Sequence, residues 1–533
     1  MINKVKISGY RIFREFELEP HKKLNLLVGA NESGKSTLLE AMILALTGRI
    51  NGRRVPDELN PFWFNTDIVN EFVANRRAGK RVAPPEIRIE LFFEDRDELQ
   101  SLCGAINTDV PTRACPGTSL SIAPNPEYAE EFEAWLEEPS PILPIEYYMD
   151  EWRDFADNRL TKRPRQLVTA VIDSRTIRST SGVDYHLRQI LADHLKPFER
   201  TAISLGYREA KVALSDTGLR SINERIGASQ APLHDKPISL AMDQSARTSW
   251  ETAITPHVDG IPFALSGQGQ QAAIKISLAM DRHSDRAAFV MIEEPENHLS
   301  HTSLAALVSR MSDLAGKQQQ LFVTTHSSFV LNRLGIDSLM LVSPTTAARI
   351  PELKPDTVRY FQKLPGYDTL RLALAERIVL VEGPSDEIVF ERIFKDLYGK
   401  RPMDLGIDTL SMRGLSLSRA LELCSVLGKR VAAVRDNDGF DPDELRESET
   451  DWLCKDTIEL FIGDVAYGTT LEPQLVYFNG EGLMRSILGV SPKADLSKWM
   501  QREKTEVALR IAESEKSIKA PDYLRQAAEF IHG

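Results

Sequence analysis

Acidic residues follow two separate apolar segments in the C-terminal third of the chain. Glu382 and Asp386 stand in VEGPSD, between the apolar run ERIVL and the helix-like run EIVFERIF. Asp436 and Asp438 follow a second apolar run, in KRVAAVRDNDGF. Carboxylates that meet in one place could hold a divalent cation, because Mg²⁺ prefers oxygen ligands and needs few protein carboxylates. The residue types predict a magnesium site, provided that the fold brings the two turns together.

The segments around these acids alternate between strand-like and helix-like patterns. Alternating β and α segments imply a parallel sheet, and the loops at the carboxyl ends of its strands converge on one crevice. We therefore expect both acidic turns at one edge of a sheet. Taken alone, the pair Asp436 and Asp438 would be read as an Asx-rich turn, because Asp and Asn favour turns. Glu472 in GTTLEPQL, taken alone, would be a solvated loop residue.

A phosphate-binding pattern occupies the N-terminal part of the chain. LNLLVGANESGKSTLLEAMILAL has the pattern of a strand, a glycine-containing loop and a helix, and the loop matches GxxxxGK[ST] in full. Backbone N–H groups of such a loop surround phosphate oxygens, and the helix N-terminus favours the negative charge. We expect Lys35 to reach the β- and γ-phosphates and Ser36 to ligate magnesium. The predicted ATP-binding residues here are Gly29, Asn31, Gly34, Lys35, Ser36 and Thr37.

A further apolar strand, in AAFVMIEEPENHLS, ends in two glutamates. Glu293 is expected to hold the ATP-bound Mg²⁺ through water, and Glu294 to polarise the attacking water as the catalytic residue of the head. The alternative is a solvated pair of acids at a strand end. LSGQGQQAAIKISLAM precedes this strand, and QQLFVTTHSS follows it with His326 at a strand end. A structural role is the alternative for His326.

This order of motifs resembles the ABC-type ATPase head of the RecF and SMC group. The residues that the resemblance assigns to the γ-phosphate of ATP are Ser266, Gly267, Gly269 and His326. Ser266 and its glycines would act on ATP held by a second subunit, and Asn297 and His298 would lie in a dimer-contact loop. Gln268 separates the two glycines, unlike the LSGGQ signature, so the backbone amides that meet phosphate are left open.

The C-terminal acids match the pattern of a Toprim domain, with Glu after one strand and DxD after another. An ABC-type head followed by a Toprim domain resembles the OLD family of ATPase-nucleases, and among its branches the nuclease subunit of Gabija-type antiphage systems. DTLRLALAERIVLVEGPSDEIVFERIF and EKTEVALRI…KAPDYLRQAAEFI carry this resemblance. The metal ligands that it implies are Glu382, Asp386, Asp436, Asp438 and Glu472. It also implies that Lys504 is catalytic, although QREKTE alone would place that lysine on the surface.

The predicted fold class is α/β, an ABC-type P-loop ATPase head with a helical insertion followed by a C-terminal α/β Toprim domain. The head comprises 1–160 and 256–343, interrupted by a helical insertion over 161–255 that serves dimerisation. A connection over 344–374 leads to the Toprim nuclease domain over 375–533. The insertion is predicted from YHLRQILADHLKPFERTAISLG, whose apolar residues have helical spacing.

Composition narrows the functional classes. With 533 residues the chain is expected to form two or three domains, and its net charge of −12 argues against coating nucleic acid through overall charge. A local basic groove remains compatible with that charge. We expect a cytoplasmic protein without a membrane partner, because the sequence has no bilayer-length apolar run and no signal-peptide core. The four cysteines show no CxxC pairing, which fits a reducing compartment.

The OLD-family resemblance implies an ATP-regulated, divalent-metal-dependent DNA endonuclease in antiphage or foreign-DNA defence. The implied cofactors are ATP with one Mg²⁺ in the head and two Mg²⁺ or Mn²⁺ ions in the Toprim domain. The implied partners are DNA and further copies of the chain in a dimer or tetramer, with a nearby UvrD-like helicase or retron element left open. A RecF/SMC-like repair ATPase without nuclease activity, or a nucleotide-dependent sensor or scaffold, is the alternative.

Overall fold

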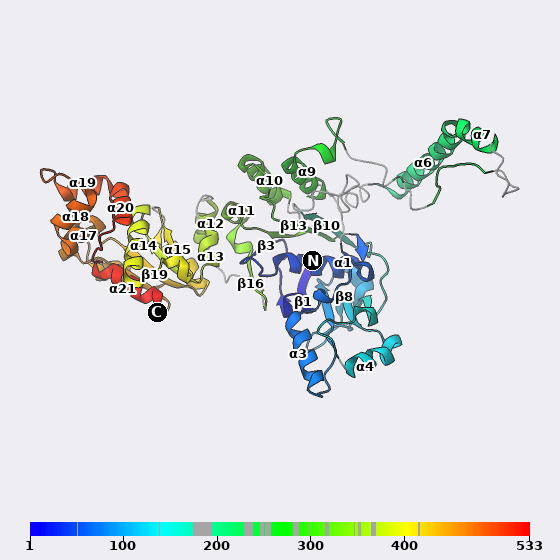
Figure 1. Ribbon diagram of the computed structural model, residues 1–533, viewed down its shortest axis with the longest axis horizontal. Helices are drawn as coiled ribbons and strands as arrows, with labels where there is room; N and C mark the ends of the chain where they lie inside the picture. The colour runs from blue at the N-terminus through cyan, green and yellow to red at the C-terminus, as the bar shows by residue number, and fades with distance from the viewer. Residues whose placement is uncertain are drawn as a thin grey trace. The chain divides into compact units, whose positions relative to one another are not determined.

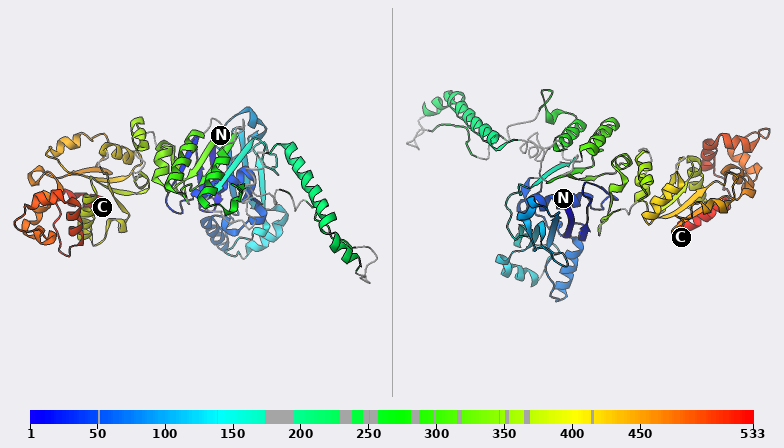
Figure 2. Two further views of the ribbon diagram at one scale, coloured as in Figure 1. Left: turned by 90° about the horizontal axis from the view of Figure 1, so that it is seen from above. Right: turned by 180° about the vertical axis from the view of Figure 1, so that it is seen from behind.

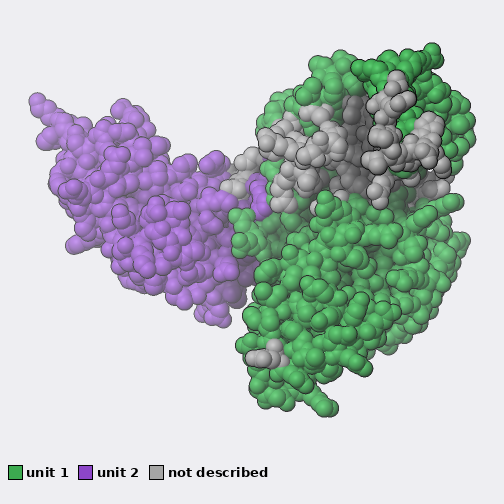
Figure 3. All heavy atoms as spheres, turned by 45° about the vertical axis from the view of Figure 1, so that its right-hand side comes forward, with its two compact units in different colours: residues 1–325, 342–348 green, residues 326–341, 349–533 purple. Residues whose placement is uncertain are grey.

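The computed structural model forms two compact units. Unit 1 comprises residues 1–325 and 342–348, and unit 2 comprises residues 326–341 and 349–533 (Figure 3). The structure describes residues 1–50, 52–137, 139–173, 195–228, 238–245, 250, 257–280, 287–297, 299–314, 319–345, 347–349, 353–363, 369–413 and 416–533. Among these residues, no helix combines the length and the apolar character that crossing a bilayer requires.

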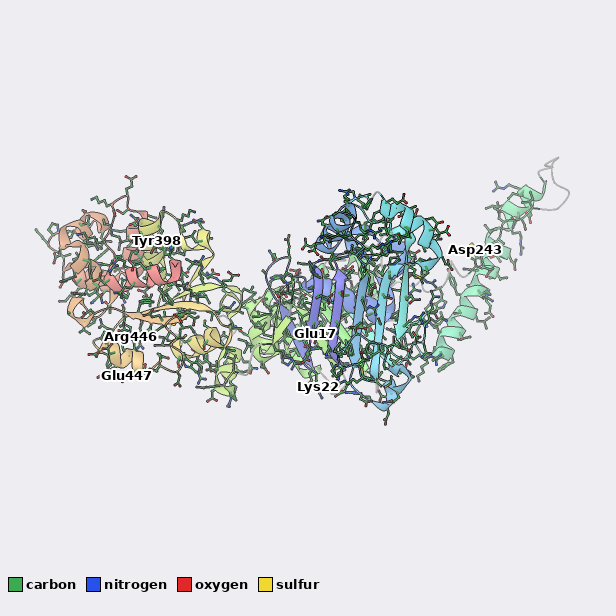
Figure 4. The ribbon with its side chains drawn as sticks, turned by 90° about the horizontal axis from the view of Figure 1, so that it is seen from below. Glu17, Lys22, Asp243, Tyr398, Arg446 and Glu447 are labelled. Atoms are coloured by element: carbon green, nitrogen blue, oxygen red, sulfur yellow. The ribbon has the colours of Figure 1, made fainter. Side chains whose placement is uncertain are left out.

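An antiparallel sheet forms one layer of unit 1, with strand order β2-β1-β6-β8-β7 and with β9 paired to β8. Its strands are β1 (Ile2–Tyr10), β2 (Phe13–Leu18), β6 (Ile87–Phe93), β7 (Cys103–Gly104), β8 (Cys115–Pro124) and β9 (Tyr148–Asp154). In β1, buried Val5 and Ile7 alternate with more exposed residues, which is the pattern of a sheet with one covered face. Glu17, labelled in Figure 4, lies on β2. It forms an ion pair of 3.6 Å with Lys4 of β1.

Parallel strands in the order β10-β13-β14-β3 form the second layer of unit 1. They are β10 (Leu167–Asp173), β13 (Ala287–Glu293), β14 (Gln319–Thr324) and β3 (Leu24–Val28). Their apolar runs are largely buried, as in sheets covered on both faces. Glu293 pairs in register with Asp173 on one side and Thr324 on the other, so the carboxyl ends of three strands are aligned. Residues at these ends are therefore neighbours although they are far apart in sequence.

Helix α1 (Lys35–Thr47) lies between the two sheets and contacts strands of both (Figure 1). Its apolar residues Leu38, Met42 and Leu46 are buried, and the indole N–H of Trp152 donates 2.8 Å to the carbonyl of Ala45. Further helices of the unit include α2 (Val55–Glu58), α3 (Thr66–Arg77), α4 (Ala129–Glu137), α9 (Gln268–Met280) and α10 (His301–Leu314). Short antiparallel pairs are β4 (Arg49–Ile50) with β5 (Arg53–Arg54), and β11 (His257–Val258) with β12 (Ile261–Pro262).

The range predicted as a helical insertion, 161–255, contains both sheet and helix. Strand β10 lies in this range and pairs with β13, so the predicted boundary at residue 161 is too early. The partner of β10 lies more than a hundred residues away, and a parallel strand leaves no local pairing pattern in the sequence. The helices described in the range are α6 (Pro197–Gly218) and α7 (Arg220–Ala228). The first half of the quoted helical stretch lies outside the described residues.

Unit 2 is built on a parallel sheet, as the alternating sequence pattern predicts, and this sheet has four strands. The strand order is β18-β17-β19-β20, with β17 (Arg377–Val381), β18 (Ile407–Ser411), β19 (Arg430–Arg435) and β20 (Ile458–Ile462). Helices α14 (Pro384–Tyr398) and α21 (Asp522–His532) pack against it (Figure 2). Phe390, Phe394 and Leu524 join the strand residues Val379 and Val381 in one buried core.

The remaining helices of unit 2 frame this sheet. Those after β20 are α17 (Leu471–Asn479), α18 (Glu481–Leu488), α19 (Leu496–Arg502) and α20 (Lys504–Glu513). Those between the strands are α15 (Leu417–Val426) and α16 (Pro442–Glu447). The predicted connection, 344–374, contains β16 (Ala347–Arg349), α12 (Pro355–Lys363) and α13 (Thr369–Leu374), preceded by α11 (Ser328–Leu334) and β15 (Leu339–Val342). It therefore has secondary structure of its own.

Candidate functional site

The phosphate-binding loop between β3 and α1 depends on its glycines. Gly34 caps α1 in the left-handed region, with φ of 97°, and a Cβ there would lie 2.6 Å from the ring of Phe13. A Cβ on Gly29 would lie 2.4 Å from the hydroxyl of Ser33. Both positions exclude a side chain for steric reasons. Asn31 is exposed in the loop, and Thr37 lies in the first turn of α1.

Lys35 is held inside this loop. Its buried ammonium donates hydrogen bonds of 2.9 Å to the carbonyl of Gly29 and 2.8 Å to that of Ala30. Burial lowers its pKa, and the carboxylates of Glu294 and Glu293 oppose this effect. The positive charge is therefore placed at the loop and also lies within the field of the acidic end of β13.

The two glutamates at the carboxyl end of β13 differ in their hydrogen-bond partners. Ser36 donates a hydrogen bond to Glu293, which joins the first turn of α1 to the end of the strand. Glu294 has a left-handed backbone with φ of 45°, and its N–H donates 3.1 Å to the carbonyl of Thr324. Asn297 donates 2.6 Å to its carboxylate. A strained backbone and an anchored carboxylate are features that gather at functional sites.

The other predicted ATP contacts lie on separate segments. His326 is exposed two residues after β14, and Ser266 stands just before α9. Gln271 donates 2.8 Å to the carbonyl of Ser266, so the hydrogen bonds described for this segment are local. A Cβ on Gly267 would meet open space, and Gly269 lies in the first turn of α9. His298 lies outside the described residues.

The predicted metal ligands of unit 2 gather at the carboxyl ends of its strands. Glu382 follows β17 and Asp436 follows β19, and the backbone N–H of Asp436 donates 3.3 Å to the carboxylate of Glu382. Asp386 lies in the first turn of α14 and accepts 2.9 Å from the N–H of Gly383. The parallel sheet has thus joined the two acidic turns, as the sequence pattern predicts.

Glu472 and Lys504 join this group from two C-terminal helices. Glu472, in the first turn of α17, is only 4% exposed and accepts 2.8 Å from the hydroxyl of Thr470. The ammonium of Lys504, the first residue of α20, lies 3.4 Å from its carboxylate, and the lysine side chain is 48% exposed. Burial lowers the pKa of Lys504, but Glu472 and Asp436 outweigh this and raise it overall. Lys504 is therefore a stable cation facing buried acids.

Like charges dominate the electrostatics of this group. The pKa of Asp436 is raised to about 8, first by burial and then by Asp386, Glu382 and Glu472, while Lys504 opposes the shift. Burial also raises the pKa of Asp386, and Glu472 adds to it. Carboxylates that interact in this way lie in one region of the fold. The one lysine beside them, Lys504, only partly offsets their mutual repulsion.

Asp438 completes the acidic turn from its exposed side. It has a left-handed backbone with φ of 50°, and its N–H donates 3.1 Å to the carbonyl of Thr469. Buried Asn437 donates 2.9 Å to each of the carbonyls of Gly463 and Gly468. The loop between β20 and α17 therefore holds the Asp436–Asp438 turn in place.

Three further residues at this edge were not expected from the sequence. Tyr523 of α21 is fully buried, and its pKa is raised well above its ordinary value by burial and by Asp436, so it remains a neutral hydroxyl. Arg435 places its Nε 3.7 Å from the carboxylate of Glu382. Arg413 is exposed with φ of 49°, and its N–H donates 3.0 Å to the Glu382 carbonyl. Only the strand-end position of the two arginines could have indicated them in the sequence.

The residues present fit a hard divalent cation. The donors are carboxylate oxygens, and burial and mutual repulsion raise the pKa values of Asp436 and Glu382, so a bound cation would stabilise their ionised forms. In the part of the chain that the structure describes, no group of three or more Asp, Glu, His or Cys side chains is arranged to hold a metal ion. An open set of carboxylates suits Mg²⁺, which keeps several waters and takes one or two protein carboxylates.

Comparison with known proteins divides the chain in the same way. Residues 4–181 and 252–332 match AAA-domain models, and residues 374–438 match the Overcoming lysogenization defect protein-like TOPRIM domain. The RecF DNA replication and repair protein of Desulforamulus reducens is 23% identical over 53% of this chain and 79% of its own length. Endonuclease GajA of Bacillus cereus is 24% identical over 34% of this chain and 33% of its own.

A solved C-terminal region of the Xanthomonas campestris OLD protein is 18% identical, with a TM-score of 0.23, over 30% of this chain and 92% of that one. The family models and the curated relatives define the class of protein: an ABC-type ATPase head followed by a Toprim domain. By these matches the chain is similar to the OLD-like ATPase–Toprim proteins. The predicted fold class and family resemblance are thus confirmed.

Proposed function

We propose that this protein is an ATP-regulated, divalent-metal-dependent DNA endonuclease that acts in antiphage or foreign-DNA defence. The observation that carries the proposal is the meeting of Glu382, Asp386, Asp436 and Glu472 beside Lys504 in unit 2. These residues come from four separate elements, and a purely structural role would not require so many like charges in one buried place. The similarity to an endonuclease, GajA, supports the same reading.

The proposed roles follow from charge and position. Glu382, Asp386, Asp436, Asp438 and Glu472 would hold two Mg²⁺ or Mn²⁺ ions. When bound, such ions supply a nucleophilic water and stabilise the leaving oxygen of a phosphodiester. Lys504 would neutralise charge that develops on the scissile phosphate, because its ammonium is partly exposed and directed at the acids. Arg435 and Arg413 would hold neighbouring phosphates of the DNA strand.

The head is proposed to bind and hydrolyse ATP with one Mg²⁺. Lys35 would bind the phosphates, Ser36 and Glu293 would position the ion, and Glu294 would polarise water. The hydrogen bond between Ser36 and Glu293 supports this pairing because it joins the loop to the acidic strand. ATP would regulate the nuclease and take no part in cleavage.

Assembly of two or more copies belongs to the same proposal. Ser266, Gly267, Gly269 and His326 would complete the ATP site of another copy, as the resemblance to RecF and SMC heads implies. Support comes from α6, on which Phe198 and Leu205 stand seven residues apart, on one face of the helix, and are each more than half exposed. An apolar helix surface of this kind favours association. Sedimentation at micromolar concentration, with and without ATP, tests this assembly, and a monomer in both conditions contradicts it.

Nicking of supercoiled plasmid tests the central proposal. The wild-type chain is expected to cut in Mg²⁺ or Mn²⁺ and to be inactive in EDTA. Cutting with and without ATP, by the wild type and by the Lys35→Ala variant, shows whether ATP activates or inhibits the nuclease. No cutting in any metal, with ATP hydrolysis intact, would favour a RecF-like repair ATPase. Absence of both DNA cutting and ATP hydrolysis would favour a sensor or scaffold. Plaque counts on cells that carry the wild type or Asp436→Ala test the defence role.

A further inference from the structure

Unit 2 carries a group of aromatic side chains termed here the aromatic surface, formed by exposed Phe440 and Tyr477 and by half-buried Tyr467 and Phe478. Tyr477 is 62% exposed and Phe440 is 58% exposed. Aromatic rings contribute most to stability when they are buried, so rings this exposed gain little from the fold itself. Their position, close to the acidic turn, points to a function in binding.

The rings of Tyr477 and Phe478 on α17, and of Tyr467 before this helix, hold one another in fixed orientation. Tyr467 and Tyr477 stack with ring centroids 4.5 Å apart and an interplanar angle of 27°. Phe478 contacts Tyr467 edge-on at 5.3 Å and Tyr477 at 5.4 Å. Tyr477 is therefore supported from within the molecule while most of its surface faces solvent. A rigid ring that is open to solvent is suited to stacking, because little conformational entropy is lost on binding.

Hydrogen bonds connect the aromatic surface to the acids. Phe440 lies two residues after Asp438 on the turn that carries the acids, and its N–H donates 2.8 Å to the carbonyl of Asn437. Tyr467 directly precedes Gly468, whose carbonyl accepts 2.9 Å from the side chain of Asn437. The turn and the loop are thus tied together at the residue between the two acids. An aromatic ring stands on each of these two segments.

We propose that the aromatic surface stacks unpaired bases of the DNA strand whose phosphodiester lies at the acids. This inference rests on the proposed nuclease function and specifies its substrate as DNA with unpaired nucleotides beside the cut. Bases are available for stacking on protein rings only when they leave the duplex, and such stacking tolerates any base. Lys504, Arg413 and Arg435 supply positive charge for the backbone of the same strand.

Binding to short DNA measures the stacking directly. A single-stranded oligonucleotide with a central 2-aminopurine is titrated with the full chain in Ca²⁺, and the duplex of the same sequence is titrated in parallel. The wild type is expected to quench the fluorescent base of the single strand. Replacement of Phe440→Leu together with Tyr477→Leu is expected to remove the quenching and weaken single-strand affinity by about tenfold, with duplex affinity unchanged.

Matched variants separate stacking from a change of fold. Tyr477→Trp keeps a flat ring and is expected to retain quenching. Met403→Ala removes a side chain that is also 62% exposed, from the short helix before β18, and is expected to change nothing. Met403 precedes the amino end of its strand, whereas the acids follow the carboxyl ends.

The results that would contradict base stacking differ from those that would contradict nuclease activity. Unquenched 2-aminopurine with the wild type, or equal weakening of single-strand and duplex binding in the double variant, rules out stacking. A change in sedimentation of the double variant without a change in DNA affinity would show that the aromatic surface binds protein. Plasmid nicking by the wild type in Mg²⁺ stands or fails independently of these binding results, so the two ideas are tested separately.

Discussion

The two candidate sites manage charge in opposite ways. In the head, the charged groups are held by hydrogen bonds to neutral partners: Lys35 donates to two carbonyl oxygens, and Ser36 donates to Glu293. In unit 2, Asp436 and its neighbours repel one another, and one lysine does not balance them. A site whose charged side chains already have hydrogen-bond partners is organised before its ligand binds. A site with excess like charge depends on a cation for its stability as well as for its chemistry.

The largest effect is expected on plasmid nicking when Asp436, which lies among the other carboxylates of unit 2, is replaced. Asp436→Ala should reduce plasmid nicking by at least about a hundredfold, since even groups that only orient metal ligands are worth up to that amount. ATP hydrolysis should stay unchanged, because Lys35, Glu293 and Glu294 lie in unit 1, whereas Asp436 lies in unit 2. Both rates are measured on one preparation. Asp404→Ala, an exposed aspartate that pairs with Arg401, is the control. Full nicking by Asp436→Ala would make the turn structural only.

Lys504→Ala should lower the nicking rate by about a hundredfold, because removing one group that stabilises transition-state charge has effects of this size. Cleavage kinetics at saturating DNA measure the change. Lys498→Ala, which alters a lysine 84% exposed on α19, should behave as the wild type. If Lys504→Ala also lost its thermal response to Mg²⁺, the lysine would have to be assigned to organising the acids instead.

Glu294→Gln tests the candidate site of the head. ATP hydrolysis should fall by about a hundredfold because an amide is a poor general base, while ATP binding stays unchanged. Lys35→Ala should instead lose ATP binding, since its charge counters the phosphates. Nucleotide affinity and phosphate release are measured for both. Equal loss of affinity in the two variants would remove the distinction drawn between binding and catalysis at this site.

The smallest effect concerns stability. Mg²⁺ at 100 times its dissociation constant should raise the free energy of unfolding by about 2.7 kcal/mol, as for any ligand that binds only the folded state. Thermal denaturation without nucleotide measures the rise, with Ca²⁺ as a second ion. Asp436→Asn should fold yet gain less from Mg²⁺, since it removes a charge from the donor set. An equal gain in this variant would locate the ion elsewhere.

The two sites also differed in how far the sequence could predict them. The phosphate-binding loop is one continuous segment, and its glycines meet a local requirement, such as the positive φ of Gly34. Local requirements leave a local pattern, so the loop could be predicted from the residues alone. The strands around Glu382 and Asp436 could also be predicted, because the alternation of β and α segments implies a parallel sheet.

Glu472 and Lys504 show where local reasoning stops. Glu472 stands in a polar stretch that predicts exposure, yet it is 4% exposed, because its neighbours Leu471 and Leu475 on α17 join the buried core of unit 2. Lys504 follows a charged stretch, and only the family resemblance singled it out. Tyr523 was missed altogether because an apolar helix face predicts core packing and not proximity to acids. Strand β10 was assigned to the insertion since its partner, β13, is distant in the chain.

The sequence by itself determined the elements whose physics is local: the loop that needs glycine, the helix that begins at Lys35 and the buried strands that end in acids. Tertiary structure decided which of these acids share a site, how deeply each is buried, and which lysine and tyrosine lie beside them. The physical reason is that burial and charge–charge interactions depend on distances between segments that packing brings together. Hydrophobic and hydrogen-bonding patterns along a chain carry little information on those distances.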